Sequence, residues 1–285
     1  MQIIHTVAEL RHALKSQTSI ALVPTMGNLH AGHIHLATLA KKQARCVVVS
    51  IFVNPLQFGA NEDLASYPRT LDADCEKLEA AGVNIVFAPN VQEMYPDFNA
   101  ATNDLGQTMT ICAPPIAKEL CGATRPGHFD GVATVVMKLF NIVMPQVAVF
   151  GKKDFQQLFI IRELIRQFNL PIEIIAGDTV REASGLAMSS RNGYLSQEQK
   201  TNAATLNVCL KQIVGSLQQG NTDFFKLEQA AAQNLNNNGW LTDYISIRSA
   251  RTLSPASKED TALVVLAAAK IGNTRLIDNI EFTRT

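Results

Sequence analysis

The sequence predicts an α/β protein built on a doubly wound parallel sheet, with a smaller α+β domain at its carboxyl end. Three observations carry this prediction. Short β-branched runs alternate with amphipathic helical stretches over residues 1–176. The run 46–53 is almost wholly apolar, which is typical of a strand buried on both faces. Beyond Ala176 a polar loop, two long helices and three strand-like pieces follow, so we expect domains at 1–176 and 177–285.

The alternation begins with a strand at 20–23, which we expect Pro24 to end, and with a helix at 31–42. After the buried strand 46–53, helices and strands continue in the same order. The helices are expected at 72–81, 131–143 and 154–168, and the strands at 83–87, 147–150 and 172–175. Ligands of such sheets bind beyond the carboxyl ends of the strands.

The second domain has a different order of elements. Its helices are expected at 197–218 and 223–236, and its strands at 244–248, 262–267 and 274–277. A loop between two domains can close over a bound nucleotide, so we interpret this domain as a lid.

Composition excludes several classes of function. Lys plus Arg equals Asp plus Glu, at 25 each, and no basic stripe occurs, which argues against a nucleic-acid partner. The five cysteines are irregularly spaced and form no C-x-x-C, which argues against a disulfide framework or a structural zinc site. The start of the chain lacks the pattern of a secretory signal, and its apolar segments are too short to span a bilayer. We therefore expect a cytoplasmic protein that acts on small molecules without a membrane partner.

A histidine pair follows the first strand directly, in the segment PTMGNLHAGH at 24–33. His30 and His33 share one face at the start of the helix. A helix N-terminus attracts anions, and imidazoles there can donate hydrogen bonds to phosphate oxygens. Gly32 leaves room for a ligand to approach the backbone. We interpret the turn as an ATP phosphate site, because a zinc site would need a third ligand that has no obvious position here.

Two further segments carry groups suited to phosphates. In FGKKDFQQ at 150–157, Gly151 permits a tight turn and Lys153 is a mobile point charge. Asp154 could cap the helix, orient a lysine or help to hold a metal-bound phosphate, whereas Lys152 reads as a solvated loop charge. In MSSRN at 188–192, two hydroxyls and a guanidinium make a credible anion clamp, and an ordinary turn is the alternative.

Polar side chains also follow the strand 46–53. Asn54 and Gln57 lie among apolar residues and suit a small substrate with hydroxyl groups, or else they satisfy the loop backbone. His128, in a compact loop, is expected to be structural. Neither G-x-x-x-x-G-K-[ST] nor G-x-G-x-x-G occurs after a strand, which excludes a P-loop enzyme and an ordinary dinucleotide binder.

Taken together, these motifs resemble the pantothenate synthetase (pantoate–beta-alanine ligase) family, whose members have a Rossmann-like nucleotidyltransferase domain with an H-x-G-H turn. The resemblance covers essentially the whole chain. It rests on PTMGNLHAGH at 24–33, VSIFVNPLQF at 49–58, YPRT at 67–70, RPGHFDGV at 125–132, KDFQQL at 153–158 and GLAMSSRNGYLS at 185–196. It also implies a homodimer.

The resemblance implies a reaction in two steps that makes a precursor of coenzyme A. The pantoate carboxylate attacks the α-phosphorus of ATP, which releases pyrophosphate and forms pantoyl adenylate. The amine of beta-alanine then attacks the activated carbonyl and gives pantothenate and AMP. Mg²⁺ would be carried on the triphosphate, and Asp74 is one candidate for a protein partner.

The resemblance also implies roles for individual residues. His33, His30 and Lys153 would be catalytic, with His33 as proton donor. Gln57 would contact pantoate and beta-alanine, and Gln157 would contact pantoate. Asn54 is expected to belong to the same substrate-binding set. The ATP-binding set comprises Met26, Gly27, Asn28, Leu29, His30, Ala31, Gly32, His33, Gly151, Lys152, Lys153, Asp154, Val180, Met188, Ser189, Ser190 and Arg191. Three residues depart from commoner family forms: Lys152, Ser184 and Cys121. These departures affect the local charge at the rim of the expected site.

Other functions compete with this one. A related adenylyl- or cytidylyltransferase would not release AMP when an amine is added, and a regulator on the same fold would bind ATP without turnover. An enzyme similar to aminoacyl-tRNA synthetases is disfavoured by the neutral charge and by the lack of an anticodon-binding extension.

Overall fold

The computed structural model describes residues 1–59 and 62–284, and the chain divides into two compact units. The first unit consists of Met1–Ala117, Arg125–Lys152 and Gln157–Asp178. The second unit begins at Thr179 and also includes Lys118–Thr124 and Lys153–Gln156. Two short segments from within residues 1–176 therefore belong to the second unit, which no local sequence pattern indicates.

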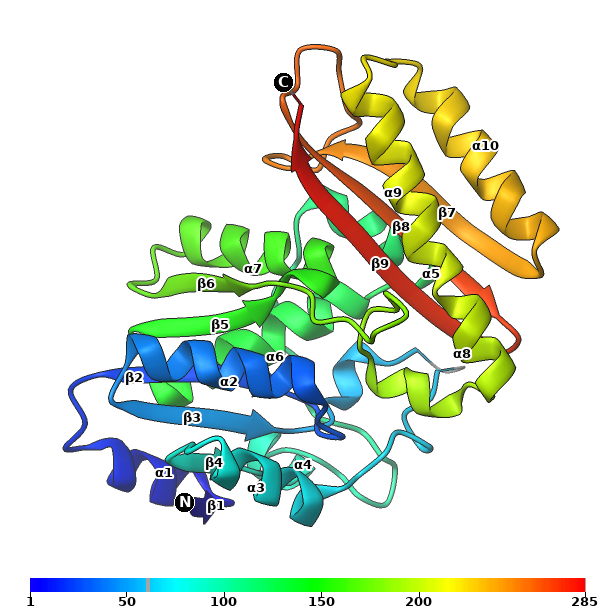
Figure 1. The fold of residues 1–285 in the computed structure, drawn as a ribbon. Coiled ribbons are helices and arrows are strands. Elements are labelled where there is room, and N and C mark those ends of the chain that lie inside the picture. The colour runs from blue at the N-terminus through cyan, green and yellow to red at the C-terminus, as the bar shows by residue number, and fades with distance from the viewer. Residues whose placement is uncertain (60–61, 285) are drawn as a thin grey trace. The chain divides into compact units, whose positions relative to one another are not determined.

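The first unit contains a six-stranded parallel sheet with the order β1-β4-β3-β2-β5-β6, drawn in Figure 1. Its strands are β1 (Gln2–Ile4), β2 (Ile20–Thr25), β3 (Cys46–Ile51), β4 (Ile85–Phe87), β5 (Val147–Gly151) and β6 (Glu173–Gly177). The strand order reverses between β2 and β5, which places a topological switch point at their carboxyl ends. The predicted doubly wound parallel sheet is confirmed.

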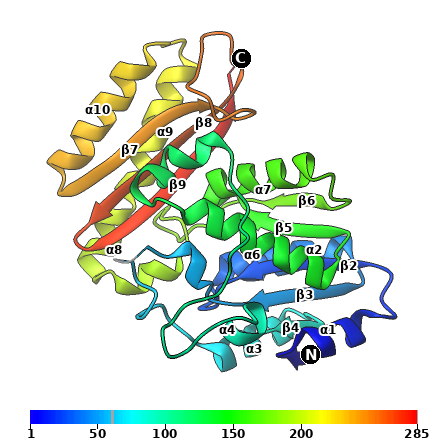
Figure 2. The same ribbon diagram turned by 180° about the vertical axis from the view of Figure 1, so that it is seen from behind.

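Helices cover both faces of this sheet (Figures 1 and 2). On one face α1 (Val7–Leu14), α6 (His128–Val143) and α7 (Phe155–Gln167) share a core with Leu22 and Val48. On the other face α2 (Ala31–Gln43) and α3 (Leu71–Ala80) share a core with Val23 and Val47. Successive residues of β2 and β3 thus enter different cores, which explains why these strands show no polar alternation.

Two expectations about the start of the sheet differ from the structure. The sequence patterns did not indicate β1 and α1, and β1 is short with only Ile4 buried. The strand β2 continues through Pro24 instead of ending there. The neighbouring β5 pairs only with Ala21 and Leu22, so Pro24 lies beyond that ladder and its missing N–H breaks no bond on that side.

The second unit is the predicted α+β domain. An antiparallel sheet with the order β7-β8-β9 packs against two helices, α9 and α10. The helix expected at 197–218 is in fact two helices, which meet at Ala204. The elements are α8 (Gln197–Ala203), α9 (Thr205–Gln218), α10 (Phe224–Asn237), β7 (Trp240–Ser249), β8 (Ala262–Ile271) and β9 (Thr274–Thr283).

The remaining elements are short. They are α4 (Val91–Met94), α5 (Cys121–Thr124) and the 3₁₀ turns η1 (Pro55–Gln57), η2 (Pro115–Lys118), η3 (Lys152–Asp154) and η4 (Ser190–Tyr194). Across the described part of the chain, no helix combines the length and the apolar character that a membrane span requires.

Candidate active site

The turn between β2 and α2 is held by a buried carboxylate from α3. Gly27 and Asn28 have positive φ angles of 85° and 49°, so the chain reverses tightly after the strand. Asp74, which is fully buried, accepts the backbone N–H groups of Asn28 and Leu29 at 2.8 Å each. Lys77 on the same helix donates to the carbonyl of Leu29 at 2.8 Å. The conformation of the turn therefore depends on α3, although the turn belongs to another β-α unit.

The two histidines of the turn cap the helix that follows. His30 is the N-cap of α2, and its Nδ1 accepts the N–H of Gly32 at 3.1 Å. The Nδ1 of His33 accepts the N–H of His30 at 3.3 Å, and the ring centroids lie 4.1 Å apart. Because each Nδ1 accepts, a neutral ring must carry its proton on Nε2. Both Nε2 atoms are therefore donors, as phosphate oxygens require.

Gly32 also makes room for a neighbouring side chain. A Cβ at this position would lie 2.8 Å from Cε1 and 2.9 Å from Nδ1 of His30. The missing side chain thus makes room for the imidazole of His30 in its capping position. The ring, in turn, satisfies a backbone donor that the first turn of a helix otherwise leaves without a partner.

The segment after β3 builds a second set of polar groups in the same unit. Asn54 is the N-cap of η1, and Gln57 ends this turn. The Nε2 of Gln57 lies 3.0 Å from the sulfur of Met26, so this side chain is next to the turn that follows β2. The Nδ1–H of His128 donates to the carbonyl of Gln57 at 2.8 Å, and the expectation that His128 is structural agrees with this position.

The residues at the end of β5 fall into both units. Gly151 ends β5, and Lys152 forms an ion pair with Asp178 at 2.9 Å, as a surface lysine can. Lys153 belongs to the second unit, where its carbonyl accepts the side-chain amide of Asn279 at 2.8 Å. Asp154 is exposed, and Gln157 lies half-buried at the start of α7.

The predicted anion clamp lies on a small loop of the second unit. Met188, the first residue of the clamp, donates its N–H to the carbonyl of Val180 at 3.0 Å. Val180, which belongs to the predicted ATP-binding set, therefore lies beside the clamp. Ser189 is the N-cap of η4 and accepts the N–H of Arg191 at 3.2 Å. The three residues Ser189, Ser190 and Arg191 are all half-buried.

An ion pair between Arg181 and Asp278 lies next to the contact that Lys153 makes with β9. Arg181 donates two hydrogen bonds to Asp278 on β9, at 2.8 and 2.9 Å. Asn207 also donates to Asp278, at 3.1 Å, and Asn279 is the residue that binds the carbonyl of Lys153. The backbone of Lys153, which is predicted to bind ATP, and the side chain of Arg181 are thus held by neighbouring residues of one strand, although their own sequence segments are far apart.

The described residues contain no group of three His, Cys, Asp or Glu side chains that could hold a metal ion. Both oxygens of Asp74 accept backbone N–H groups, so this carboxylate serves the turn. All five cysteines are free.

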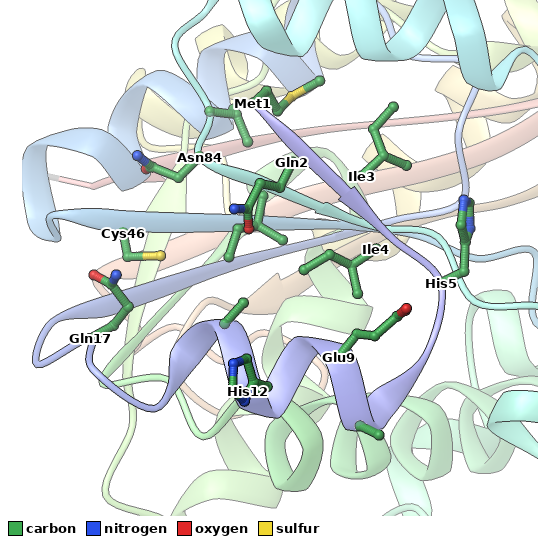
Figure 3. A pocket seen from close by; sticks show the side chains of 14 residues that line it. Met1, Gln2, Ile3, Ile4, His5, Glu9, His12, Gln17, Cys46 and Asn84 are labelled. Carbon is green, nitrogen blue, oxygen red and sulfur yellow. The ribbon is translucent and has the colours of Figure 1, made fainter.

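An open hollow of about 1110 Å³ lies elsewhere in the first unit (Figure 3). It is lined by residues of β1 and α1, and by Cys46, Asn84 and Ile85 at the amino ends of β3 and β4. Sheets of this kind bind ligands at the carboxyl ends of their strands. The hollow is therefore separate from the turn after β2.

Sequence reasoning missed the residues that hold the site together. Asp74 was considered only as a metal partner, and Tyr95, Asp278 and Asn279 were not singled out. Asp74, Tyr95 and Asn279 each contact a site residue that is distant in the sequence, and Asp278 precedes Asn279 on β9, so no local spacing could reveal them. Other charged residues surround Asp74 in α3, so the sequence did not mark Asp74 as the buried one.

Comparison with known proteins gives the same picture over the whole length. The family model described as Pantoate-beta-alanine ligase matches residues 2–281. The chain is 67% identical over 283 residues to the pantothenate synthetase of Methylobacillus flagellatus, with 99% of each chain covered. It is 56% identical to that of Thiobacillus denitrificans, covering 99% of this chain and 98% of the relative.

Solved structures agree with these sequence relatives. The crystal structure of pantothenate synthetase from Thermus thermophilus matches with a TM-score of 0.91 at 41% identity, covering 98% of this chain and 99% of that chain. A pantoate-beta-alanine ligase from Francisella tularensis, complexed with beta-gamma ATP and beta-alanine, matches with a TM-score of 0.81 at 33% identity, covering 98% and 97%.

Proposed function

The chain belongs to the pantoate–beta-alanine ligase family, and we propose that it binds the phosphates of ATP at the turn 26–33 while it joins pantoate to beta-alanine. The reaction is an ATP-dependent condensation that passes through pantoyl adenylate and releases AMP and pyrophosphate. The observation that carries the assignment of the turn is the mutual capping of His30 and His33, which makes both Nε2 atoms donors.

The first step places negative charge on the phosphate oxygens of ATP. Donors that are already fixed can stabilise this charge without reorganising at the moment of reaction. In the first unit these donors are His30 and His33, with the backbone of the turn from Met26. His33 is assigned as the proton donor, and the contact between its Nδ1 and the N–H of His30 holds its ring in place.

Lys153 and the loop 188–191 are the second group of ATP ligands in this proposal. The chain has serines and Arg191 where lysines would offer point charges, so the ammonium is assigned to Lys153. Gly151, Lys152, Asp154 and Val180 complete the set. The support from the structure is that Asn279 and Asp278 hold the backbone of Lys153 and the side chain of Arg181 to one strand.

The second step needs pantoate and beta-alanine to be held in order. Gln57 is assigned to both substrates and Gln157 to pantoate. Asn54 is 1% exposed and donates to Gln57 Oε1 at 3.1 Å, so its contribution passes through Gln57. The adenylate is sensitive to water, and closure of the second domain over the site would protect it.

Three assignments rest on the family and on the chemistry. Mg²⁺ is expected on the triphosphate, where it would neutralise phosphate charge, and both oxygens of Asp74, the candidate protein partner, already accept backbone N–H groups. The protein is assigned to the cytoplasm, where ATP is available and its five free cysteines stay reduced. A homodimer is expected, and sedimentation equilibrium would measure it.

The proposal for the turn is tested by His33→Ala. We expect turnover to fall by about 100-fold or more, because an electrostatic or acid contribution to the first step is lost. The readout is exchange of labelled pyrophosphate into ATP, which depends on pantoate and reports the first step alone. Near-normal exchange in this variant would remove His33 from the mechanism.

Two controls separate chemistry from folding. His35→Ala changes a histidine on the same helix and is expected to leave the exchange rate within about twofold of the parent. His33→Asn keeps a side chain that can cap, so it should restore stability without restoring the rate. AMP formation with pantoate and beta-alanine added singly and together excludes a nucleotidyltransferase that stops at the first product.

A further inference from the structure

A chain of buried hydrogen bonds runs from Tyr95 to Gln57. Tyr95 follows α4, is 1% exposed and donates its hydroxyl to Oδ1 of Asn54 at 2.5 Å. Asn54 is equally enclosed, and its Nδ2 lies 3.1 Å from Oε1 of Gln57. Because burial raises the pKa of Tyr95, the hydroxyl keeps its proton at neutral pH and remains a donor.

The partners of Asn54 determine which way its amide faces. Its Nδ2 also lies 3.2 Å from the backbone carbonyl of Gly131, which can only accept. Its Oδ1 faces the hydroxyl of Tyr95 and the backbone N–H of Leu56. A rotated amide would set oxygen against the carbonyl and nitrogen against the N–H of Leu56, so the orientation is fixed from both ends.

The orientation of Asn54 then decides the orientation of Gln57. Since Asn54 donates, the atom of Gln57 that meets it must be Oε1, and Nε2 is left on the other side, 3.0 Å from the sulfur of Met26. A thioether is a weak acceptor, so a substrate oxygen can replace it with a gain in hydrogen-bond energy. The backbone of Gln57 is also fixed, because His128 and Arg125 both reach its carbonyl, at 2.8 and 3.4 Å.

We propose that Tyr95 is a positioning residue for substrate recognition: acting through Asn54, it holds the amide of Gln57 with its N–H group toward the substrate. Gln57 therefore recognises an acceptor oxygen of pantoate and disfavours a group that can only donate. This inference rests on the proposed contact between Gln57 and pantoate. It adds that Gln57 is the hydrogen-bond donor in this contact, and that Tyr95 helps to orient its amide.

The test begins with Tyr95→Phe, which removes one hydroxyl and leaves the ring. We expect the KM for pantoate to rise about tenfold, because Asn54 loses one of the contacts that hold it and, through it, the amide of Gln57. The KM for ATP and the kcat should stay within about twofold, since the phosphate contacts are unchanged. Initial rates of AMP formation give all three constants.

Tyr244→Phe is the matched control. It also removes a tyrosine hydroxyl with a hydrogen-bond partner, the sulfur of Cys121 at 3.1 Å, but this half-buried tyrosine has no part in the chain that ends at Gln57. We expect it to leave the KM for pantoate unchanged. An equal rise in both variants would show a general loss of packing and would overturn the proposal.

A double-mutant cycle shows whether Tyr95 acts through Gln57. Gln57→Ala should raise the KM for pantoate, and adding Tyr95→Phe to it should raise this constant by no more than about twofold further. If Tyr95→Phe has its full effect in the Gln57→Ala background, or has none in the parent, the proposal is wrong. Gln57→Glu offers only acceptors at neutral pH, so it should weaken the binding of pantoate at least as strongly as Gln57→Ala does.

The same data separate this inference from the proposed function. Without pantoate-dependent AMP formation in the parent protein, the function itself would fail. If the parent is active and Gln57→Ala has a normal KM for pantoate, the contact of Gln57 fails, and the proposal falls with it. If both behave as expected and Tyr95→Phe is normal, only the role of Tyr95 is wrong.

Discussion

At the scale of single residues, the segments proposed to carry the chemistry are held by polar side chains that are buried. Asp74 is the clearest case. Its two oxygens take the N–H groups of Asn28 and Leu29, and Thr70 adds a hydrogen bond at 3.1 Å. A carboxylate with this many donors tolerates complete burial, and the backbone donors of the turn are satisfied at the same time. The histidines thus begin their helix from a backbone that is already fixed.

Asp74→Asn tests this role. An asparagine can accept only through Oδ1, so one backbone N–H of the turn would lose its acceptor and face another donor. We expect a loss of about 1–3 kcal/mol in the free energy of unfolding and a higher KM for ATP. Urea unfolding and steady-state rates measure the two effects. Asp72→Asn, on the exposed side of the same helix, should change the stability by no more than about 0.5 kcal/mol.

At the scale of elements, the approach of α6 to η1 brings the substrate-binding segment into position. Gly131 lies in the first turn of α6, and a Cβ there would lie 2.3 Å from the carbonyl oxygen of Leu56 and 2.8 Å from the nitrogen of Gln57. Both atoms belong to the backbone and cannot move aside as a side chain can. The helix and the 3₁₀ turn therefore pack at a distance that only glycine permits.

Gly131→Ala is expected to separate these two elements. We predict a loss of about 1–3 kcal/mol in the free energy of unfolding, as for other overpacked sites, together with a higher KM for pantoate. The matched control is Gly215→Ala in α9, where no atom lies within 4 Å of the added Cβ. That change should stabilise the protein by about 0.5–1 kcal/mol, because alanine is the better helix former. Equal stability of the two variants would contradict the packing argument.

At the scale of the whole molecule, the free energy of unfolding depends on the protonation of ionisable groups as well as on packing. The formal net charge is zero, so the pH dependence of unfolding comes from individual groups and not from general repulsion. Glu228 on α10 is one such group. Its Oε1 accepts the N–H of Ile247 on β7 at 2.6 Å, yet burial raises the pKa of this carboxyl above its usual value of 4.5.

The sign of the effect follows from that direction. The folded state holds the proton of Glu228 more tightly than the unfolded chain does, so this carboxyl favours folding less as the pH rises from 4.5 through its raised pKa. Glu228→Gln keeps an acceptor for Ile247 and removes the titration. We expect the variant to be the more stable protein at pH 7 to 8, with the advantage disappearing below about pH 4.5. Urea unfolding over this pH range would contradict the argument if the parent were more stable at neutral pH.

The sequence by itself determined the parts of this protein that short stretches of chain encode. The unbroken apolar run of β3 predicted a strand covered on both faces, and the spacing of His30, Gly32 and His33 after a strand predicted a phosphate site. Such features depend on neighbours a few residues away, because strand and helix periods are local. Several ordered motifs then identified the family before any contact was known.

Only the tertiary structure decided what holds these parts in place. Asn28 meets Asp74 across 46 positions, Asn54 meets Tyr95 across 41, and Lys153 meets Asn279 across 126. The structure also showed that 118–124 and 153–156 belong to the unit formed by the end of the chain. A buried polar group needs a partner, but the sequence does not say which distant residue folding will bring to it. For that reason local motifs could nominate candidate site residues, whereas their distant contact partners had to be observed.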